Sequence, residues 1–316
     1  MNGKILLMGE PMGLFIAEET GKLSEVNRFS SSIAGAEYNV ALGLIRLGHE
    51  AAYCTRLGKD PFGEKILAAL NENGISADLV VQDEEKLTGF MMKSQVESGD
   101  PAISYFRKNS AASAMTAHDV DKLDLYGCEW LHLTGITPAL SDSMYGAVKR
   151  LIARADTLEM FISFDPNLRP MLWESEAKMV SVLNELAKSA NLVLPGVNEG
   201  RILAGTENPR EIAEFYHNMG VHYVIVKLGA DGAYYSEKGK ESGQIPAFPV
   251  NKIVDTVGAG DGFAAGVISA LAEGISLKEA AERGAVIGSV QISNKSDNEG
   301  LPSRSRLEDI MEKGIV

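Results

Sequence analysis

The sequence predicts an α/β fold in which a mostly parallel central sheet is flanked by helices. Two observations predict it. Short apolar runs alternate with amphipathic helical patterns through most of the 316 residues, and no internal repeat, low-complexity tract or linker interrupts the alternation. Strands that alternate with helices are typical of βαβ units, which build parallel sheets. We therefore expect a single domain over 1–316.

The predicted strands are short apolar runs, each bounded by polar or turn-forming residues. In chain order they are Lys4–Met8, Ala51–Arg56, Trp130–Thr134, Met160–Phe164, Leu192–Leu194 and Tyr223–Lys227.

The predicted helices are longer segments with apolar residues three or four positions apart. In chain order they are Ala36–Leu47, Pro61–Asn71, Ser143–Ala153, Glu176–Ser189, Arg210–Met219, Asp261–Leu271 and Leu277–Ile292. The first shows the pattern well, because Val40, Leu44 and Leu47 share one face before Gly48 ends the helix.

Two segments break the alternation. Residues 14–31 have no clear helical period, and residues 87–112 contain aromatic and β-favouring runs around a turn signal at Ser98–Pro101. We interpret 14–31 and 87–112 as a small β-sheet lid beside the main sheet. The alternative is an extra edge hairpin with no functional role.

Composition narrows the function classes. Hydrophobic residues make up 45% and charged residues 23%, which is ordinary for a soluble enzyme, and the net charge of -13 argues against nucleic acid or an anionic membrane as partner. Cys54 and Cys128 lie in apolar contexts without metal-ligand spacing, which predicts buried thiols in a reducing compartment. No run has the length of a signal peptide or membrane span, so we expect a cytoplasmic protein.

The most informative stretch is the glycine-rich run Asp255–Asp261, which leads into a predicted helix. Unpaired backbone N–H groups and the positive end of the helix dipole favour phosphate oxygens there. A carboxylate beside phosphate is unfavourable unless it has a task, such as accepting a proton from an attacking hydroxyl, which Asp261 would do. In the alternative interpretation Asp261 only caps the first turn.

Polar residues also gather at two other element boundaries. Residues 34–41 open a helix with small side chains that let a ligand approach the backbone, and Asn39 either hydrogen-bonds sugar hydroxyls or caps the turn. Asp165, Asn167 and Arg169 follow a predicted strand, at the sheet edge where open parallel sheets bind ligands. A simple turn is the alternative for this segment.

Two later segments carry weaker signals. Glu199 follows a strand and a turn, and either organises a magnesium ion through water or is a first-turn acid favoured by the dipole. The segment Val224–Tyr235 is predicted to form two strands joined by a glycine turn, which taken alone is an ordinary hairpin.

Together these segments resemble the ribokinase-like carbohydrate kinases of the phosphofructokinase-B type, over the whole chain. The resemblance is carried by Gly35–Asn39, Glu199, the Lys227–Gly229 turn and, most specifically, Asp255–Asp261. It implies a three-layer sandwich, a β-lid over the sugar site, and ATP bound along the 227–232 loop and the last helices.

Carried over residue by residue, the resemblance makes Asp261 the catalytic base. The backbone N–H groups of Gly258, Ala259 and Gly260 would form the anion hole for the γ-phosphate. Asp255 matches a position that in many relatives binds a monovalent cation such as K⁺ or touches the substrate.

The implied cofactors are ATP and Mg²⁺, with Glu199 reaching the metal through water. One position near Glu199 departs from the family pattern, since Gly196 replaces the family's asparagine. Asn198 lies close by in the sequence, but we expect its side chain to point away from the metal site. The residues implied at the nucleotide are Asn167, Lys227, Gly229, Gly232, Gly258 and Gly260.

Two arginines indicate the acceptor. Arg107 in the lid and Arg169 after a strand suit a carboxylate, which two guanidinium groups can hold by bidentate hydrogen bonds, whereas a neutral sugar would leave them unpaired. The pattern resembles the branch of the family that phosphorylates the 6-hydroxyl of 2-keto-3-deoxygluconate. The implied substrate-binding residues are Gly35, Ala36, Glu37, Tyr38, Asn39, Tyr105, Arg107, Arg169 and Asp255.

Alternatives remain open at this level. If Arg107 faces solvent and Arg169 forms an ion pair or contacts phosphate, the protein would be a kinase of a neutral sugar. If catalysis has been lost, the protein would be a sugar or nucleotide sensor. Relatives often dimerise through the lid, so we expect a homo-oligomer. Asp297 is either a solvated loop residue or a substrate contact.

Overall fold

A nine-stranded sheet forms the middle layer of the protein in the computed structural model, which describes residues 3–96, 101–294 and 297–314. The strands up to β11 pair in parallel, and β12 and β13 add an antiparallel edge. Their order across the sheet is β13 (Ser242–Ile245), β12 (Ala233–Glu237), β11 (Tyr223–Lys227), β10 (Leu192–Val193), β9 (Phe161–Asp165), β8 (Cys128–Thr134), β1 (Lys4–Met8), β4 (Ala51–Gly58) and β5 (Val80–Asp83).

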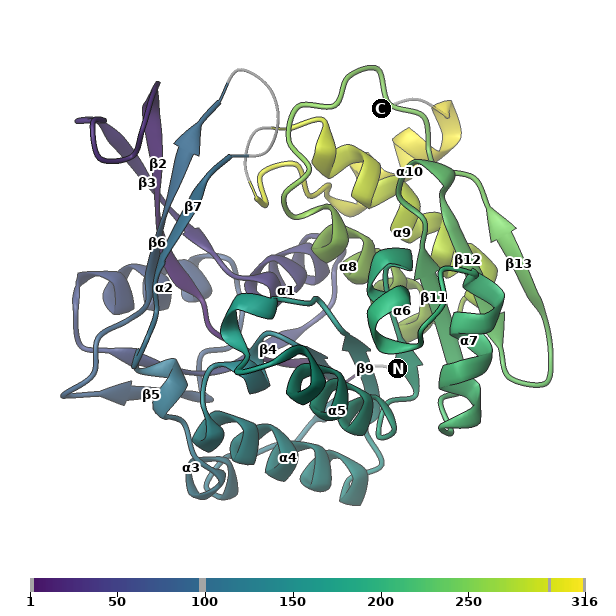
Figure 1. Cartoon of the computed structure of the whole chain (residues 1–316), viewed down its shortest axis with the longest axis horizontal. Coiled ribbons are helices and arrows are strands. Elements are labelled where there is room, and N and C mark those ends of the chain that lie inside the picture. Colours follow the sequence, from purple (N-terminus) through teal and green to yellow (C-terminus); the bar gives the residue numbers. More distant parts are fainter. Residues whose placement is uncertain (1–2, 97–100, 295–296, 315–316) are drawn as a thin grey trace.

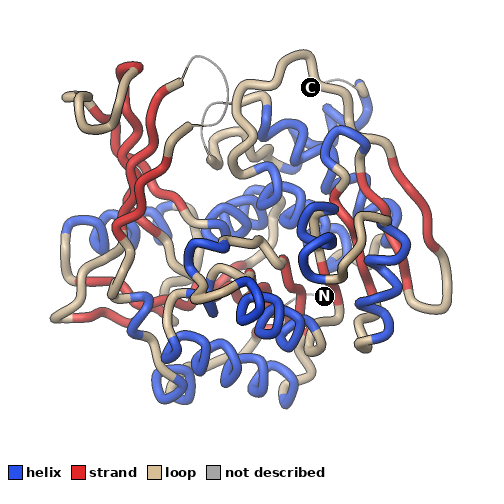
Figure 2. The backbone as a smooth tube through the Cα atoms, viewed as in Figure 1, coloured by secondary structure: helices blue, strands red, loops and turns tan. Residues whose placement is uncertain are grey.

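Helices cover both faces of this sheet (Figures 1 and 2). The helices packed in one buried cluster are α3 (Ala117–Asp121), α4 (Asp142–Thr157), α5 (Glu176–Ala187), α6 (Val197–Leu203) and α7 (Pro209–Asn218). Those packed in the other are α1 (Ala36–Arg46), α2 (Pro61–Glu72), α8 (Ala259–Ala272) and α9 (Leu277–Ile292), with α10 (Arg304–Lys313) packed against α1 and α9. The predicted three-layer fold is confirmed.

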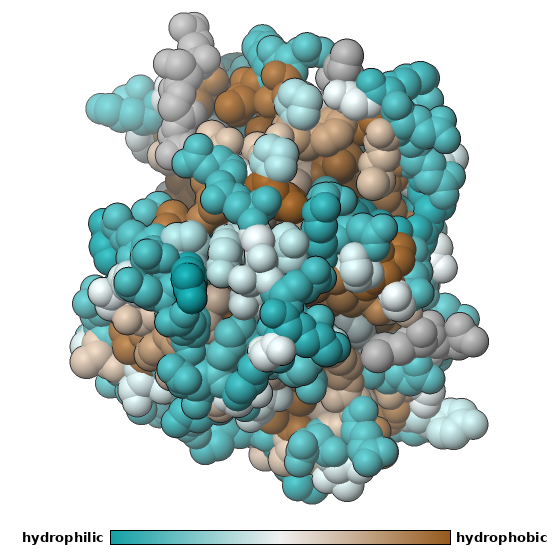
Figure 3. Space-filling model, turned by 90° about the vertical axis from the view of Figure 1, so that its right-hand side faces the viewer, coloured by the Kyte–Doolittle hydropathy of each residue, from teal (hydrophilic) through white to brown (hydrophobic). Residues whose placement is uncertain are grey.

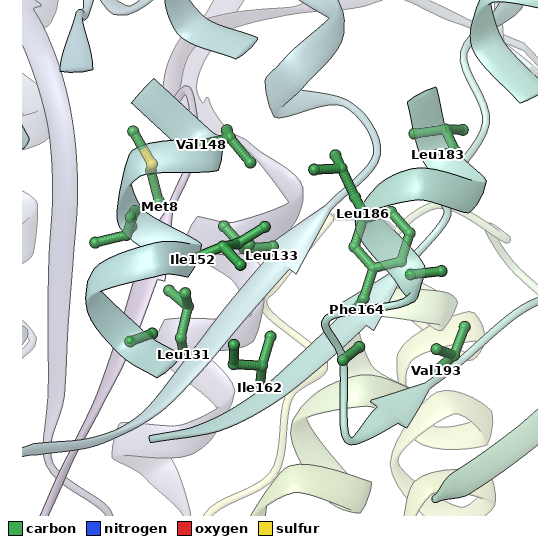
Figure 4. Close-up of a cluster of buried hydrophobic side chains, with 14 of the residues drawn as sticks. Met8, Leu131, Leu133, Val148, Ile152, Ile162, Phe164, Leu183, Leu186 and Val193 are labelled. Atoms are coloured by element: carbon green, nitrogen blue, oxygen red, sulfur yellow. The ribbon is translucent and has the colours of Figure 1, made fainter. Parts of the chain in front are cut away.

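The two clusters follow from the alternation of side chains along the strands. Leu131 and Leu133 of β8 point to one face, where Figure 4 shows them packed with residues of β9, α4 and α5, while Trp130 belongs to the opposite cluster. The helices begin at residues that the sequence offers as caps. Asp60, for example, accepts hydrogen bonds from the N–H groups of Phe62 and Gly63 at 3.0 and 2.9 Å.

A separate four-stranded sheet stands apart from the main body, at the upper left of Figure 1. Its order is β3 (Phe29–Ala34), β2 (Met12–Thr20), β6 (Phe90–Gln95) and β7 (Ile103–Phe106). These strands fall in or next to 14–31 and 87–112, where a small sheet was predicted; the predicted turn at 98–101 lies mostly outside the described residues. Its apolar inner face includes Met12, Leu14 and Met91.

The predicted strands and helices all appear with closely similar bounds, including the hairpin of β11 and β12. Two short or strongly charged helices, α3 and α10, were not predicted, and of α6 only the start near Glu199 was predicted. Cys54 is buried as expected, but Cys128 is only partly buried, because it begins β8 near the end of the sheet. Both thiols are free.

On the face seen in Figure 3, hydrophilic residues cover most of the surface and hydrophobic residues gather mainly in its upper part. Within the described residues, no helix combines the length and apolar character needed to cross a membrane.

Candidate active site

The start of α8 forms the centre of the site. Gly258 is the N-cap residue, with a left-handed φ of 78°, and a Cβ at this position would overlap the carbonyl oxygen of Asp297. The N–H groups of Gly260 and Asp261 have no acceptor within α8 and lie at its positive end, and the Ala259 N–H makes only a long hydrogen bond of 3.4 Å to the Thr256 carbonyl. Asp261 makes no capping hydrogen bond, so the interpretation of this residue as a helix cap is wrong.

The Asp261 carboxylate is held by a chain of amides instead. Its Oδ2 accepts a hydrogen bond from Asn39 Nδ2 at 2.8 Å, and Asn39 Oδ1 accepts one from Asn298 Nδ2 at 2.9 Å. Burial raises the pKa of Asp261 to about 7; the Asn39 hydrogen bond opposes this, while the negative charges of Asp165 and Glu37 add to it. A carboxylate with a pKa near neutrality is suited to accept a proton at physiological pH.

Asp261 opens into a cavity of about 540 Å³ between the two sheets. Gly35, Ala36 and Asn39 line it from the start of α1, and Asp165, Asn167 and Arg169 line it from the carboxyl end of β9. Met91, Tyr105 and Arg107 close it from the four-stranded sheet. The structure thus brings together residues from most of the segments that the sequence singled out.

A second cavity, of about 610 Å³, adjoins the first. The two share Lys227, Gly229, Thr256 and Gly260, so the turn before α8 lies where they meet. Gly232 also lines the second cavity, whose wall is mostly apolar: Ala247, Phe248, Pro249, Val250, Ile253, Phe263, Ala285 and Ile292.

Three titratable side chains, those of Asp165, Glu199 and Lys227, line the first cavity, and Lys227 also lines the second. Lys227 Nζ contacts Asp165 Oδ2 at 2.6 Å, and burial lowers the pKa of Lys227 less than Asp165 and Glu199 raise it, so the ammonium stays charged. Glu199 accepts hydrogen bonds from the N–H groups of Leu168 at 2.9 Å and Gly196 at 2.6 Å, and burial raises its pKa. Each Glu199 oxygen accepts one backbone hydrogen bond and keeps a lone pair that can accept another, which suits contact with a metal-bound water.

Gly196 and Asn198 both line the first cavity. A Cβ at Gly196 would meet Glu199 Oε2 at 3.4 Å, so the backbone at this position has room for a Cβ.

Arg107 is already paired within the protein. Its side chain is 9% exposed, and Nε donates a hydrogen bond to Glu10 Oε2 at 2.6 Å, while Ser110 donates to the other Glu10 oxygen. The alternative of a solvent-facing Arg107 is therefore wrong. The prediction that both guanidinium charges are available is also wrong, because the Glu10 carboxylate already neutralises that of Arg107.

We expect Arg107→Met to lower the free energy of unfolding by about 3–5 kcal/mol, because Glu10 would keep a buried charge without its partner. Urea unfolding monitored by tryptophan fluorescence would measure the change. The matched control is Arg28→Met, which breaks the exposed Arg28–Glu19 pair on the same sheet and should cost little. Equal effects of the two substitutions would contradict the assignment.

Arg169 is the cavity arginine whose charge is available. It is partly buried, and its Nη1 donates a hydrogen bond to the Leu168 carbonyl at 2.8 Å. Within the described part of the chain, no carboxylate lies within ion-pairing distance of Arg169, so the alternative interpretation of an internal ion pair is wrong. The guanidinium faces the same cavity as Asp261.

Three predicted substrate residues lie elsewhere. Glu37 is buried and accepts hydrogen bonds from Thr134 and Thr137, each at 2.6 Å, and Tyr38 packs in the core. Asp255 is held by Lys93 at 2.7 Å. None of the three lines the cavity, so we do not include them among the substrate contacts proposed below.

Sequence reasoning missed Glu10 and Lys93. Glu10 could have been found because it closely follows strand β1, just as Asp165 ends β9, and polar residues at strand ends often line a site. Lys93 could have been found because it lies on the same face of β6 as buried Met91, where a lysine is unexpected.

Comparison with known proteins agrees with this architecture. The pfkB family carbohydrate kinase model matches residues 2–304. The chain is 43% identical over 301 residues to 2-dehydro-3-deoxygluconokinase from Bacillus subtilis, covering 95% of this chain and 92% of that protein.

Two solved structures are similar throughout. The PfkB protein from Polaromonas sp. JS666 has a TM-score of 0.89 and 42% identity, over 97% of this chain and 99% of that one. An uncharacterized sugar kinase from Pyrococcus horikoshii in complex with ATP has a TM-score of 0.82 and 25% identity, over 98% of each chain.

Proposed function

Because the chain belongs to the pfkB family of carbohydrate kinases, we propose that it transfers the γ-phosphoryl group of ATP to the 6-hydroxyl of 2-keto-3-deoxygluconate. The observation that carries this proposal is one cavity with a proton-accepting carboxylate, Asp261, and an available guanidinium, Arg169. The 43% identity to a 2-dehydro-3-deoxygluconokinase supports the same substrate, since the two names describe one sugar acid.

Asp261 is the general base in this proposal. As the acceptor hydroxyl attacks, its proton passes to the Asp261 carboxylate, which Asn39 keeps oriented. The N–H groups of Gly258, Ala259 and Gly260 stabilise the charge that develops on the transferred phosphoryl group. These N–H groups are suited to stabilising that charge because the start of α8 holds them in place before the substrate binds.

The second cavity is the proposed nucleotide site. Its apolar wall suits the flat adenine ring, and Lys227, Gly229 and Gly232 lie on the side that leads to the turn. Asn167 lines the first cavity and would approach the phosphates of the nucleotide from that side. Bound Mg²⁺ would neutralise phosphate charge, and Glu199 would hold its water ligands.

Arg169 is the proposed partner of the substrate carboxylate, with Gly35, Ala36, Asn39, Tyr105 and Arg107 around the rest of the sugar acid. Arg107 keeps its pair with Glu10 and shapes the wall. The four-stranded sheet acts as a lid that excludes water and limits ATP hydrolysis.

The test is ADP release in a coupled assay with magnesium and ATP. The acceptors are 2-keto-3-deoxygluconate, its galactonate epimer, fructose and ribose. Turnover restricted to the acids supports the proposal and shows which epimer is preferred. Turnover of a neutral sugar alone would contradict it, and no turnover with any acceptor would favour a sensor.

We also propose a homo-oligomer formed through the outer face of the four-stranded sheet. There the ring of Phe90 stacks on that of Phe106 and, at the side of the sheet, on Phe62 of α2, with centroids 4.6 and 5.7 Å apart. Phe106 and Leu87 are 51% and 70% exposed, which is costly in a monomer. Light scattering should give a mass of at least twice 33.9 kDa, and a mass of 33.9 kDa would contradict the proposal. The two free thiols and the use of ATP suit the cytoplasm as the proposed location.

A further inference from the structure

Lys93 makes a buried link between the four-stranded sheet and the turn before α8. Its side chain is 5% exposed on the inner face of β6. Its Nζ lies 2.7 Å from Asp255 Oδ2 and 2.9 Å from Asp297 Oδ1. Burial lowers the pKa of Lys93, but the two carboxylates outweigh this and raise it, so the ammonium keeps its charge.

The two carboxylates hold opposite sides of the turn that begins α8. Asp255 starts the turn, and its Oδ1 accepts a hydrogen bond from the Val257 N–H at 3.0 Å. Asp297 lies against the far end, where its carbonyl oxygen contacts the position of a Cβ on Gly258. A cation that binds both side chains therefore fixes the backbone whose N–H groups form the proposed anion hole.

Electrostatics makes this cation necessary. Asp255 and Asp297 are 12% and 6% exposed, so water screens their mutual repulsion poorly. Without a positive charge between them, the two carboxylates would repel each other and push the Asp255 turn away from Asp297. That displacement would disturb a site that must also accept phosphate.

We propose that Lys93 is a positioning residue that supplies this cation from within the chain. Its ammonium fixes the Asp255–Gly258 turn, couples the four-stranded sheet to the anion hole, and makes phosphoryl transfer independent of an added monovalent cation. This inference rests on the kinase function proposed above, and it assigns to Lys93 the charge that a K⁺ ion was expected to provide at Asp255.

Lys93→Ala tests the role directly. We expect kcat to fall by about 10²-fold, because the anion hole would be misplaced, with a smaller change in the KM for ATP. Ethylammonium or propylammonium ions, which fit the space left by the side chain, should restore part of kcat. The matched control is Lys22→Ala, in the hairpin of the same sheet, where an exposed lysine pairs with exposed Glu25; it should keep the wild-type kcat.

A second measurement uses the wild-type protein and does not depend on how the variant folds. Its kcat should be the same whether tetramethylammonium or K⁺ is the monovalent cation. A requirement for K⁺, or a Lys93→Ala variant with wild-type kcat, would overturn the inference, and so would a loss of kcat in a folded variant that no alkylammonium ion restores. Absence of kinase activity in the wild-type protein would instead overturn the proposed function.

Discussion

Asp261→Asn should lower kcat by about 10³-fold, within the 10²–10⁴ range of general-base catalysis, while ATP and the sugar acid still bind. The amide keeps the shape of the carboxylate and an oxygen that can accept the Asn39 hydrogen bond, but it cannot take a proton. Steady-state kinetics and calorimetric binding would measure the two effects. The matched control is Asp142→Asn, which changes an exposed first-turn acid of α4 and should leave kcat unchanged.

The pH dependence gives the same substitution a second, independent readout. The folded-state pKa of Asp261, about 7, lies above the ordinary value of 3.8, so the carboxyl is protonated below neutrality. The kcat/KM of the wild type should therefore rise with pH and level off above about 7. Between about pH 4 and 7 the folded state binds the extra proton, so this group makes folding less favourable as pH rises.

Asp261→Asn removes the loss of folding stability that the wild-type carboxyl group causes as pH rises. The variant should be more stable than the wild type at pH 8, on the order of a few kcal/mol, and the difference should vanish near pH 4. Thermal unfolding at the two pH values would measure it. Near-normal turnover in the variant, or equal stability at pH 8, would contradict the assignment of Asp261 as a buried base.

Arg169→Gln should raise the KM for 2-keto-3-deoxygluconate by about 10²-fold, with a much smaller effect on the KM for ATP. Hydrogen bonds to a charged group contribute about 1.5–3 kcal/mol, and each 1.4 kcal/mol is a factor of ten in affinity. Arg169 is the cavity guanidinium without a carboxylate partner in the described residues, so its loss is not compensated by Arg107, which Glu10 already holds.

The matched control for Arg169→Gln is Arg201→Gln, which removes an exposed guanidinium of α6 that pairs with exposed Glu207. It should leave both KM values unchanged. If Arg169→Gln raised the KM for ATP instead, Arg169 would contact the nucleotide phosphates, and the recognition of the substrate carboxylate would have to be assigned to other residues.

The sequence by itself determined the layers of the fold and the centre of the site. Apolar runs alternating with amphipathic segments required parallel strands covered by helices, and β1 and β11 appear with the bounds that were predicted. The run Asp255–Asp261 by itself predicted a phosphate-binding site with a proton acceptor, because a glycine turn, a helix start and a carboxylate lie within seven consecutive residues. Local patterns of this kind need no knowledge of distant parts of the chain.

Only the tertiary structure decided which charges are available. Glu10 and Arg107 are far apart in sequence, as are Lys93 and Asp255, and nothing local predicts that either pair will meet. All four side chains are at most 12% exposed where the four-stranded sheet meets the main body, and burial makes an unpaired charge costly, so each has its partner there. That pairing, set by the fold and invisible in any single segment, leaves Arg169 as the available guanidinium and makes Lys93 the cation of the turn.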